Sequence, residues 1–128
     1  MDYTNPAYWS AAVNAGLCRL LVLREVCRKP GHGYALVHRI ASRTRWVCTP
    51  TEATIYPTLA ELTQSGCLQV TDCPVGRRMR KVYAATPEGR RACVLGTRAW
   101  RAGLQALCGA PSKTQSIRPS RGGRVIDI

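Results

Sequence analysis

The sequence lacks phenylalanine altogether and has only seven acidic residues among its 128. Without phenylalanine, we expect the core to be built from leucine, valine, isoleucine, alanine and the three tryptophans. So few carboxylates offer no paired acids for general acid–base catalysis. The two histidines have no serine or cysteine partner with an evident orienting group. We therefore expect no enzymatic activity.

Long apolar runs are also missing. The longest apolar-rich stretch, AAVNAGLCRLLVL, is interrupted by Asn14 and Arg19, and it is shorter than the roughly 20 residues that span a bilayer. Residues 1–10 lack the basic start and apolar stretch of a secretory signal. These absences predict a cytoplasmic protein with no membrane partner.

The seven cysteines are an odd number and form no C-x-x-C motif. A structural zinc site is therefore unsupported, and we expect no cofactor. In a reducing compartment these cysteines are free thiols rather than a disulfide framework.

Positive charge is abundant, with a formal net charge of +12. Residues 1–108 carry 15 Lys and Arg against 6 acidic residues, a charge of +9, so the basic character is not confined to the end of the chain. A small domain of this kind favours a polyanionic partner, most often nucleic acid.

Hydrophobic periodicity predicts an α+β, mainly helical domain. Asn5-Pro6 begins a long helix that runs to residue 28, with a break near residues 14–16 left open. The other expected elements are helices at 33–44, 51–65 and 87–108, a brief strand at 45–50, and a β-hairpin at 67–85. In this order the elements make a winged helix-turn-helix, whose third helix enters the major groove of DNA.

The third helix, TEATIYPTLAELTQSG, contains a proline that needs an explanation. Ile55, Leu59 and Leu62 share one face, while Pro57 lies on the opposite face and removes a backbone donor at a cost of about 3 kcal/mol. Its outer face is small and uncharged at the centre, which suits close approach to the floor of a DNA groove.

Three stretches together resemble the PadR family of bacterial transcriptional regulators: GHGYALVHRI, TEATIYPTLAELTQSG and GRRMRKVYAATPEGRR. The resemblance covers about residues 10–108 and is similar to the family's short form, with a single C-terminal helix. It implies a homodimer with long N-terminal and C-terminal dimerisation helices. It also implies a repressor of a detoxification or efflux operon, released by a small aromatic or cationic effector. We expect residues 1–108 to form this DNA-binding and dimerisation domain and residues 109–128 to be a basic, disordered tail.

Candidate contacts to double-stranded operator DNA come from the third helix and the hairpin. Phosphate is attracted to the free donors at a helix N-terminus and to guanidinium groups. The candidates are Thr51, Thr54, Tyr56, Pro57, Arg77, Arg78, Arg80 and Lys81. Tyr56 has the alternative of packing against the second helix, and Arg39 and Arg43 are weaker candidates for phosphate contacts.

Effector candidates lie on the helices that the resemblance assigns to the dimer interface. Trp100 can stack on a planar or cationic ligand or simply fill the dimer core. Cys18, paired across that interface with Cys93 or Cys108, would bind a thiophilic metal or metalloid or act as a redox switch; the alternative is that these cysteines are small buried hydrophobes. A thiol-based sensor and a sequence-blind nucleic-acid binder therefore remain alternative functions.

Overall fold

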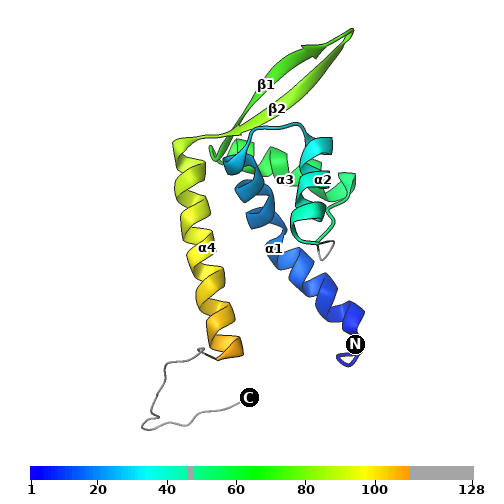
Figure 1. The fold of residues 1–128 in the computed structure, drawn as a ribbon, viewed down its shortest axis with the longest axis vertical. Coiled ribbons are helices and arrows are strands. Elements are labelled where there is room, and N and C mark those ends of the chain that lie inside the picture. Colours follow the sequence, from blue (N-terminus) through cyan, green and yellow to red (C-terminus); the bar gives the residue numbers. More distant parts are fainter. Residues whose placement is uncertain (46–47, 110–128) are drawn as a thin grey trace. The chain divides into compact units, whose positions relative to one another are not determined.

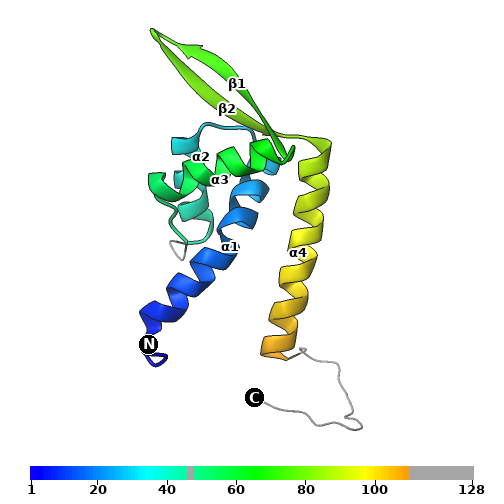
Figure 2. The same ribbon diagram turned by 180° about the vertical axis from the view of Figure 1, so that it is seen from behind.

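The computed structural model describes residues 1–45 and 48–109. Four helices and one hairpin follow each other along the chain: α1 (Pro6–Arg28), α2 (Gly33–Arg43), α3 (Glu52–Gln64), β1 (Leu68–Val75), β2 (Arg78–Ala85) and α4 (Pro87–Cys108). Residues 1–96 form one compact unit, and a second begins at Thr97, within α4. The first unit is a winged helix: α1, α2 and α3 pack together and the hairpin projects away from them (Figures 1 and 2).

Helix α1 is continuous through residues 14–16, so the break left open by the sequence is absent. It starts as expected from local chemistry: the side chain of Asn5 accepts a hydrogen bond from the backbone of Ala7, and Pro6 occupies the first helical position, where a missing N–H costs nothing. The apolar residues of its C-terminal half enter the core.

The core of the first unit is aliphatic and contains cysteine. Its largest fully buried side chains are Leu36, Ile40, Ile55, Leu59, Val22, Val26 and Cys48. The expectation that tryptophan fills this core is wrong for Trp9, which is 53 % exposed near the N-terminus. Trp9 packs against Tyr3 and Tyr8 and donates its indole N–H to the carbonyl of Tyr3.

A buried carboxylate joins α1 to α2. Glu25 is 3 % exposed and is paired with Arg39 at 3.4 Å and with Arg43. Arg39 also donates to the carbonyl oxygens of Glu25 and Lys29, both at 2.7 Å, which satisfies acceptors that the end of a helix leaves free. One guanidinium therefore both neutralises the buried acid and caps α1.

Replacing Glu25 with Gln should lower the free energy of unfolding by about 2 kcal/mol, because it leaves Arg39 half-buried without a counter-ion. Urea unfolding followed by circular dichroism measures this. Glu61→Gln is the matched control: its pair with Arg19 lies at the surface, where such pairs contribute about 0–1 kcal/mol. Equal losses in the two variants would contradict a special role for Glu25.

The hairpin has a regular antiparallel register, from Leu68 opposite Ala85 to Val75 opposite Arg78. Gly76, with φ of 62°, opens the two-residue turn, where glycine adopts a positive φ without strain.

The expected strand at 45–50 is not formed by its described residues 48–50, and residues 46–47 lie outside the described part. The backbone that pairs with β2 from outside the hairpin is that of Gly31 instead. Gly31 and Tyr83 exchange two backbone hydrogen bonds, at 2.9 and 3.1 Å.

Helix α4 begins as its TPEG sequence predicts. The hydroxyl oxygen of Thr86 accepts a hydrogen bond from the backbone N–H of Gly89 at 3.0 Å, and Pro87 is the first helical residue. Gly89 is buried against the backbone of Cys67. The helix ends at Cys108, followed by Gly109 with φ of 80°. The tail predicted at 109–128 lies, beyond Gly109, outside the described residues.

Candidate nucleic-acid interface

One groove combines the hairpin, the start of α2 and the outer side of α3. It has a volume of about 530 Å³. Its lining residues are His32, Gly33, Tyr34, Tyr56, Val75, Arg78, Met79, Arg80, Lys81 and Tyr83. The groove thus brings Tyr56 together with three of the four predicted hairpin cations, although the two segments are more than 20 residues apart in the sequence.

Tyr56 lies directly over Gly33, the first residue of α2. A Cβ at position 33 would come within 2.5–2.8 Å of the Tyr56 ring and hydroxyl, so only glycine leaves room for the ring. The side chain is nevertheless 43 % exposed. Both roles considered for Tyr56 are therefore compatible: one side of the ring packs against α2, and the rest is open to solvent in the groove.

The hairpin cations differ in their electrostatic partners. Lys81 is 3.4 Å from Asp72 on the facing strand, which offsets part of its charge. Arg77, Arg78 and Arg80 form no ion pair with any of the described residues. Arg77 lies in the turn itself and does not line the groove. Three uncompensated guanidinium groups therefore gather at the outer end of the hairpin.

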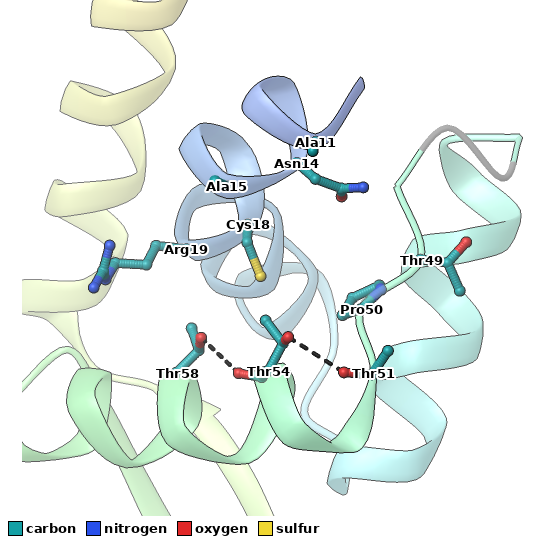
Figure 3. A pocket seen from close by; sticks show the side chains of 10 residues that line it. All are labelled: Ala11, Asn14, Ala15, Cys18, Arg19, Thr49, Pro50, Thr51, Thr54 and Thr58. Atoms are coloured by element: carbon teal, nitrogen blue, oxygen red, sulfur yellow. Dashed lines mark hydrogen bonds between the residues drawn. The ribbon is translucent and has the colours of Figure 1, made fainter. Parts of the chain in front are cut away.

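Thr51 and Thr54 lie on another side of α3 from Tyr56. They line a separate hollow of about 450 Å³ together with residues of α1, and their hydroxyls are 3.3 Å apart (Figure 3). Thr51 occupies the N-cap position but makes no side-chain cap bond. Pro57 is exposed and lines neither hollow. The predicted contacts from α3 are thus divided between two sides of the helix.

The winged-helix geometry agrees with comparisons to known proteins. The model of the transcriptional regulator PadR-like family matches residues 21–94, more than half of the chain. The chain belongs to the PadR-like family. It is therefore a DNA-binding transcriptional regulator, and its family consists of regulators rather than enzymes.

Solved structures of similar proteins support the assignment of this PadR-like protein. A PadR family transcriptional regulator from Eggerthella lenta DSM 2243 is 27 % identical, with a TM-score of 0.70 over 81 % of this chain and 92 % of that chain. A transcriptional regulator from Clostridium thermocellum has the same fold, with a TM-score of 0.70 at 20 % identity over 79 % of this chain and 99 % of that chain. No curated protein gave a significant sequence match. Among the described residues of the PadR-like chain, no helix is long and apolar enough to cross a membrane.

His32 is a residue of the PadR-like groove that the sequence analysis did not connect with DNA. Its Nδ1 accepts a hydrogen bond from the backbone N–H of Ala35 at 3.4 Å and so caps α2. Desolvation lowers the pKa of His32, and the positive charges of Arg80 and Arg39 lower it further. The neutral ring that results is the form that can accept this bond. Histidine is not among the residues preferred at a helix N-cap, so the sequence carried no signal for this role.

Tyr34, Met79 and Tyr83 are further groove residues that the sequence analysis missed. Tyr34, on α2, and Met79 are 59 % and 65 % exposed, whereas Tyr83 is buried. The alternation along β2 was the available signal for Met79 and Tyr83, because it puts residues 79, 81 and 83 on one side of the strand.

Arg39 and Arg43, the weaker candidates for phosphate contacts, are both ion-paired within the PadR-like chain. Both are paired with the buried Glu25, and Arg39 is further held by the carbonyls at the end of α1. Their position four residues apart on α2 suggested an outward charged face. The buried acid on the neighbouring helix draws Arg39 inward, whereas half of the Arg43 side chain stays exposed.

The predicted effector residues of the PadR-like chain lie in different environments. Cys18 is 8 % exposed, and its thiol is directed toward the hollow of Figure 3. Cys93 is half-buried against the core, and Cys108 is exposed. Trp100 lines an apolar hollow of about 420 Å³ on the second half of α4, with Leu104 and Leu107. Within the described residues, no three or more His, Cys, Asp or Glu are arranged to hold a metal.

Replacing Gly33 with Ala should lower operator affinity about tenfold, the equivalent of about 1.4 kcal/mol, because the new methyl group displaces Tyr56 from the groove. Fluorescence anisotropy with labelled duplex measures the change. The double variant Gly33→Ala/Tyr56→Ala tests whether Gly33 acts by leaving room for the Tyr56 ring. If it does, the double variant should bind operator DNA as well as the single variant Tyr56→Ala. Additive losses would show that Gly33 acts in another way.

Proposed function

We propose that this regulator is a homodimeric, ligand-responsive repressor that binds operator DNA through the hairpin and the outer side of α3. The observation that carries the proposal is the groove in which the exposed ring of Tyr56 faces the cations of β2. Guanidinium groups bind phosphate or a narrow minor groove. An aromatic ring and small apolar groups, such as Pro57, fit against thymine methyls. Thr51 and Thr54 add phosphate contacts near the start of α3.

Two copies of the groove are needed for a palindromic operator, because half-sites repeat about one helical turn apart. Exposed apolar side chains on α4 support association through this helix. Leu104 and Leu107 lie three residues apart on one face of α4 and are 50 % and 80 % exposed. In a monomer this apolar face would be left in contact with water. The exposed Trp9 and Val13 on α1 add to the apolar area available for a partner copy.

Replacing Leu104 with Glu should shift the protein from dimer to monomer and raise its dimer dissociation constant at least 100-fold, because a charge would be buried between copies. Sedimentation velocity across a range of concentrations measures this. Gln105→Glu is the matched control, since it adds the same charge on a different face of the same helix. A Leu104→Glu protein that remains a dimer would contradict association through this surface of α4.

A small planar or cationic aromatic compound is the proposed effector, stacking on Trp100 in its apolar hollow. A thiophilic metal or an oxidant acting on cysteines is the second candidate, supported by the cysteine count and by the thiol of Cys18 in a separate hollow. The regulated operon is proposed to encode detoxification or efflux proteins, in line with the family resemblance.

Binding to the DNA upstream of its own gene tests the repressor function. The full-length protein is mixed with labelled upstream duplex and with excess unlabelled competitor. Upstream duplex should compete at least about 1,000 times better than random duplex, the lower end of the usual ratio of specific to non-specific affinity. Equal competition by both would favour a sequence-blind binder and overturn the repressor. Release of the complex by planar cationic dyes or phenolic acids, lost in Trp100→Ala but kept in Trp9→Ala, would identify the aromatic effector site.

A further inference from the structure

Three cysteines from separate parts of the chain converge where α4 begins. Cys27 lies in the last turn of α1, Cys67 between α3 and β1, and Cys93 in the second turn of α4. All three are half-buried, reduced and packed against the same core cluster, and all belong to the first compact unit. None of the proposed DNA contacts uses them.

Gly89 is the point around which these cysteines meet. The thiol of Cys27 donates a long hydrogen bond to the carbonyl oxygen of Gly89, with Sγ and oxygen 3.9 Å apart. On its other side Gly89 packs against the backbone of Cys67 so closely that a Cβ would overlap it. Cys93 follows Gly89 by one helical turn and therefore lies on the same face of α4. This places the thiols of Cys27 and Cys93 on the same side of the junction between α1 and α4.

Cys27 and Cys93 are also neighbours by their electrostatic effect on each other. After burial, the charge and the side-chain hydrogen bond of Cys93 are the next causes of the raised pKa of Cys27. A soft metal ion displaces thiol protons as it binds, so two neighbouring thiols can become a pair of thiolate ligands.

We propose that Cys27 and Cys93 form a two-thiolate site for a soft monovalent cation of the copper(I) class. Thiolate sulfur selects such cations, and two ligands satisfy copper(I). Zinc sites take three or four protein ligands and iron–sulfur clusters take four, and the described residues offer no group of three or more ligands here. This pair differs from the Cys18 pairings expected from the sequence.

Binding converts two thiols and one monovalent cation into a bis-thiolate complex with a net charge of −1, and two protons pass to solvent. Arg90 is placed to offset this negative charge, because its Nη1 donates to the carbonyl oxygen of Cys27 at 3.1 Å. The complex would link the end of α1 to the start of α4. The site does not depend on the proposed repressor function, since metal binding can be measured without DNA.

Anaerobic titration of the full-length protein with copper(I), in competition with a coloured copper(I) chelator, tests the site. One ion per chain should bind, and the apparent affinity should rise with pH because protons are released. Cys27→Ser and Cys93→Ser should each lower the affinity at least 100-fold. Cys73→Ser is the control, since Cys73 is an exposed cysteine on the hairpin, and this variant should bind as the parent does.

Three results would overturn the site: no binding by the parent protein, an equal loss of affinity in the Cys73→Ser control, or an equal loss in Cys67→Ser, which would indicate three ligands. Thermal unfolding of each metal-free variant shows whether it is folded. Cys27→Ala and Cys93→Ala keep a small apolar side chain at each position, so loss of metal binding in these folded variants would support the site independently of packing.

Discussion

Replacing Arg77, Arg78 and Arg80 together with Ala lowers operator affinity by about 100-fold or more near 0.1 M salt and flattens its salt dependence. Each phosphate contact contributes about 0.9 to the slope of log affinity against log salt. Loss of three contacts in each copy of a dimer therefore reduces the slope by about 5. The three side chains have no ion-pair partner among the described residues, so their removal leaves no acid exposed. Anisotropy titrations at several salt concentrations measure both quantities.

The matched control removes the same charge elsewhere. Arg24, Arg98 and Arg101 are exposed and form no ion pair in the described part of the chain, and their joint replacement with Ala should change the affinity less than tenfold. If both triple variants lost affinity equally, bulk positive charge rather than the hairpin would account for binding. The hairpin variant should remain folded, because its altered side chains lie outside the core.

Replacing Gly89 with Ala should lower the free energy of unfolding by about 3 kcal/mol. The new Cβ would overlap the carbonyl oxygen of Cys67, and that backbone is fixed because the same oxygen accepts a hydrogen bond from the Thr86 N–H at 3.0 Å. Either α4 tilts or the turn before β1 moves, and both routes disturb the core. Urea unfolding measures the change.

Gly103→Ala is the control for Gly89, since Gly103 lies in the same helix and a Cβ added there would meet no neighbouring atom within 4 Å. Alanine there should stabilise the helix by about 0.5–1 kcal/mol, because it restricts the unfolded chain. A Gly89→Ala protein as stable as the parent would mean that α4 does not pack on Cys67.

Element boundaries could be predicted from the sequence because they depend on local chemistry. Two helices begin at a cap residue followed by proline: α1 at Asn5-Pro6 and α4 at Thr86-Pro87. Glycines with positive φ mark the turn of the hairpin, at Gly76, and the end of α4, at Gly109. The strand expected at 45–50 was wrong in its described part, because strand pairing depends on distant partners: Gly31 pairs with Tyr83 instead.

The sequence predicted which residues belong to the candidate site better than it predicted how they are arranged in space. Helical periodicity separated the outer face of α3 from the core, but it could not show that Thr51 and Tyr56 face different hollows. The ion pair of Arg39 was not expected from the sequence, because its partner, Glu25, lies 14 residues earlier on another helix. No local pattern reveals a pairing of that kind.

The exchange of hydrogen bonds between Gly31 and Tyr83 limits how the chain can vary in length. Loops usually tolerate insertions, yet each residue that connects α1 to α2 makes a specific hydrogen bond. The carbonyl groups of Lys29 and Pro30 bind Arg39. Gly31 pairs with β2, and His32 caps α2. An added residue would break at least one of these links. The turn at Gly76 has no such partners among the described residues, so added pairs of residues there would only lengthen the hairpin. In related chains, natural variation in length should therefore be concentrated at the tip of the hairpin and absent between α1 and α2.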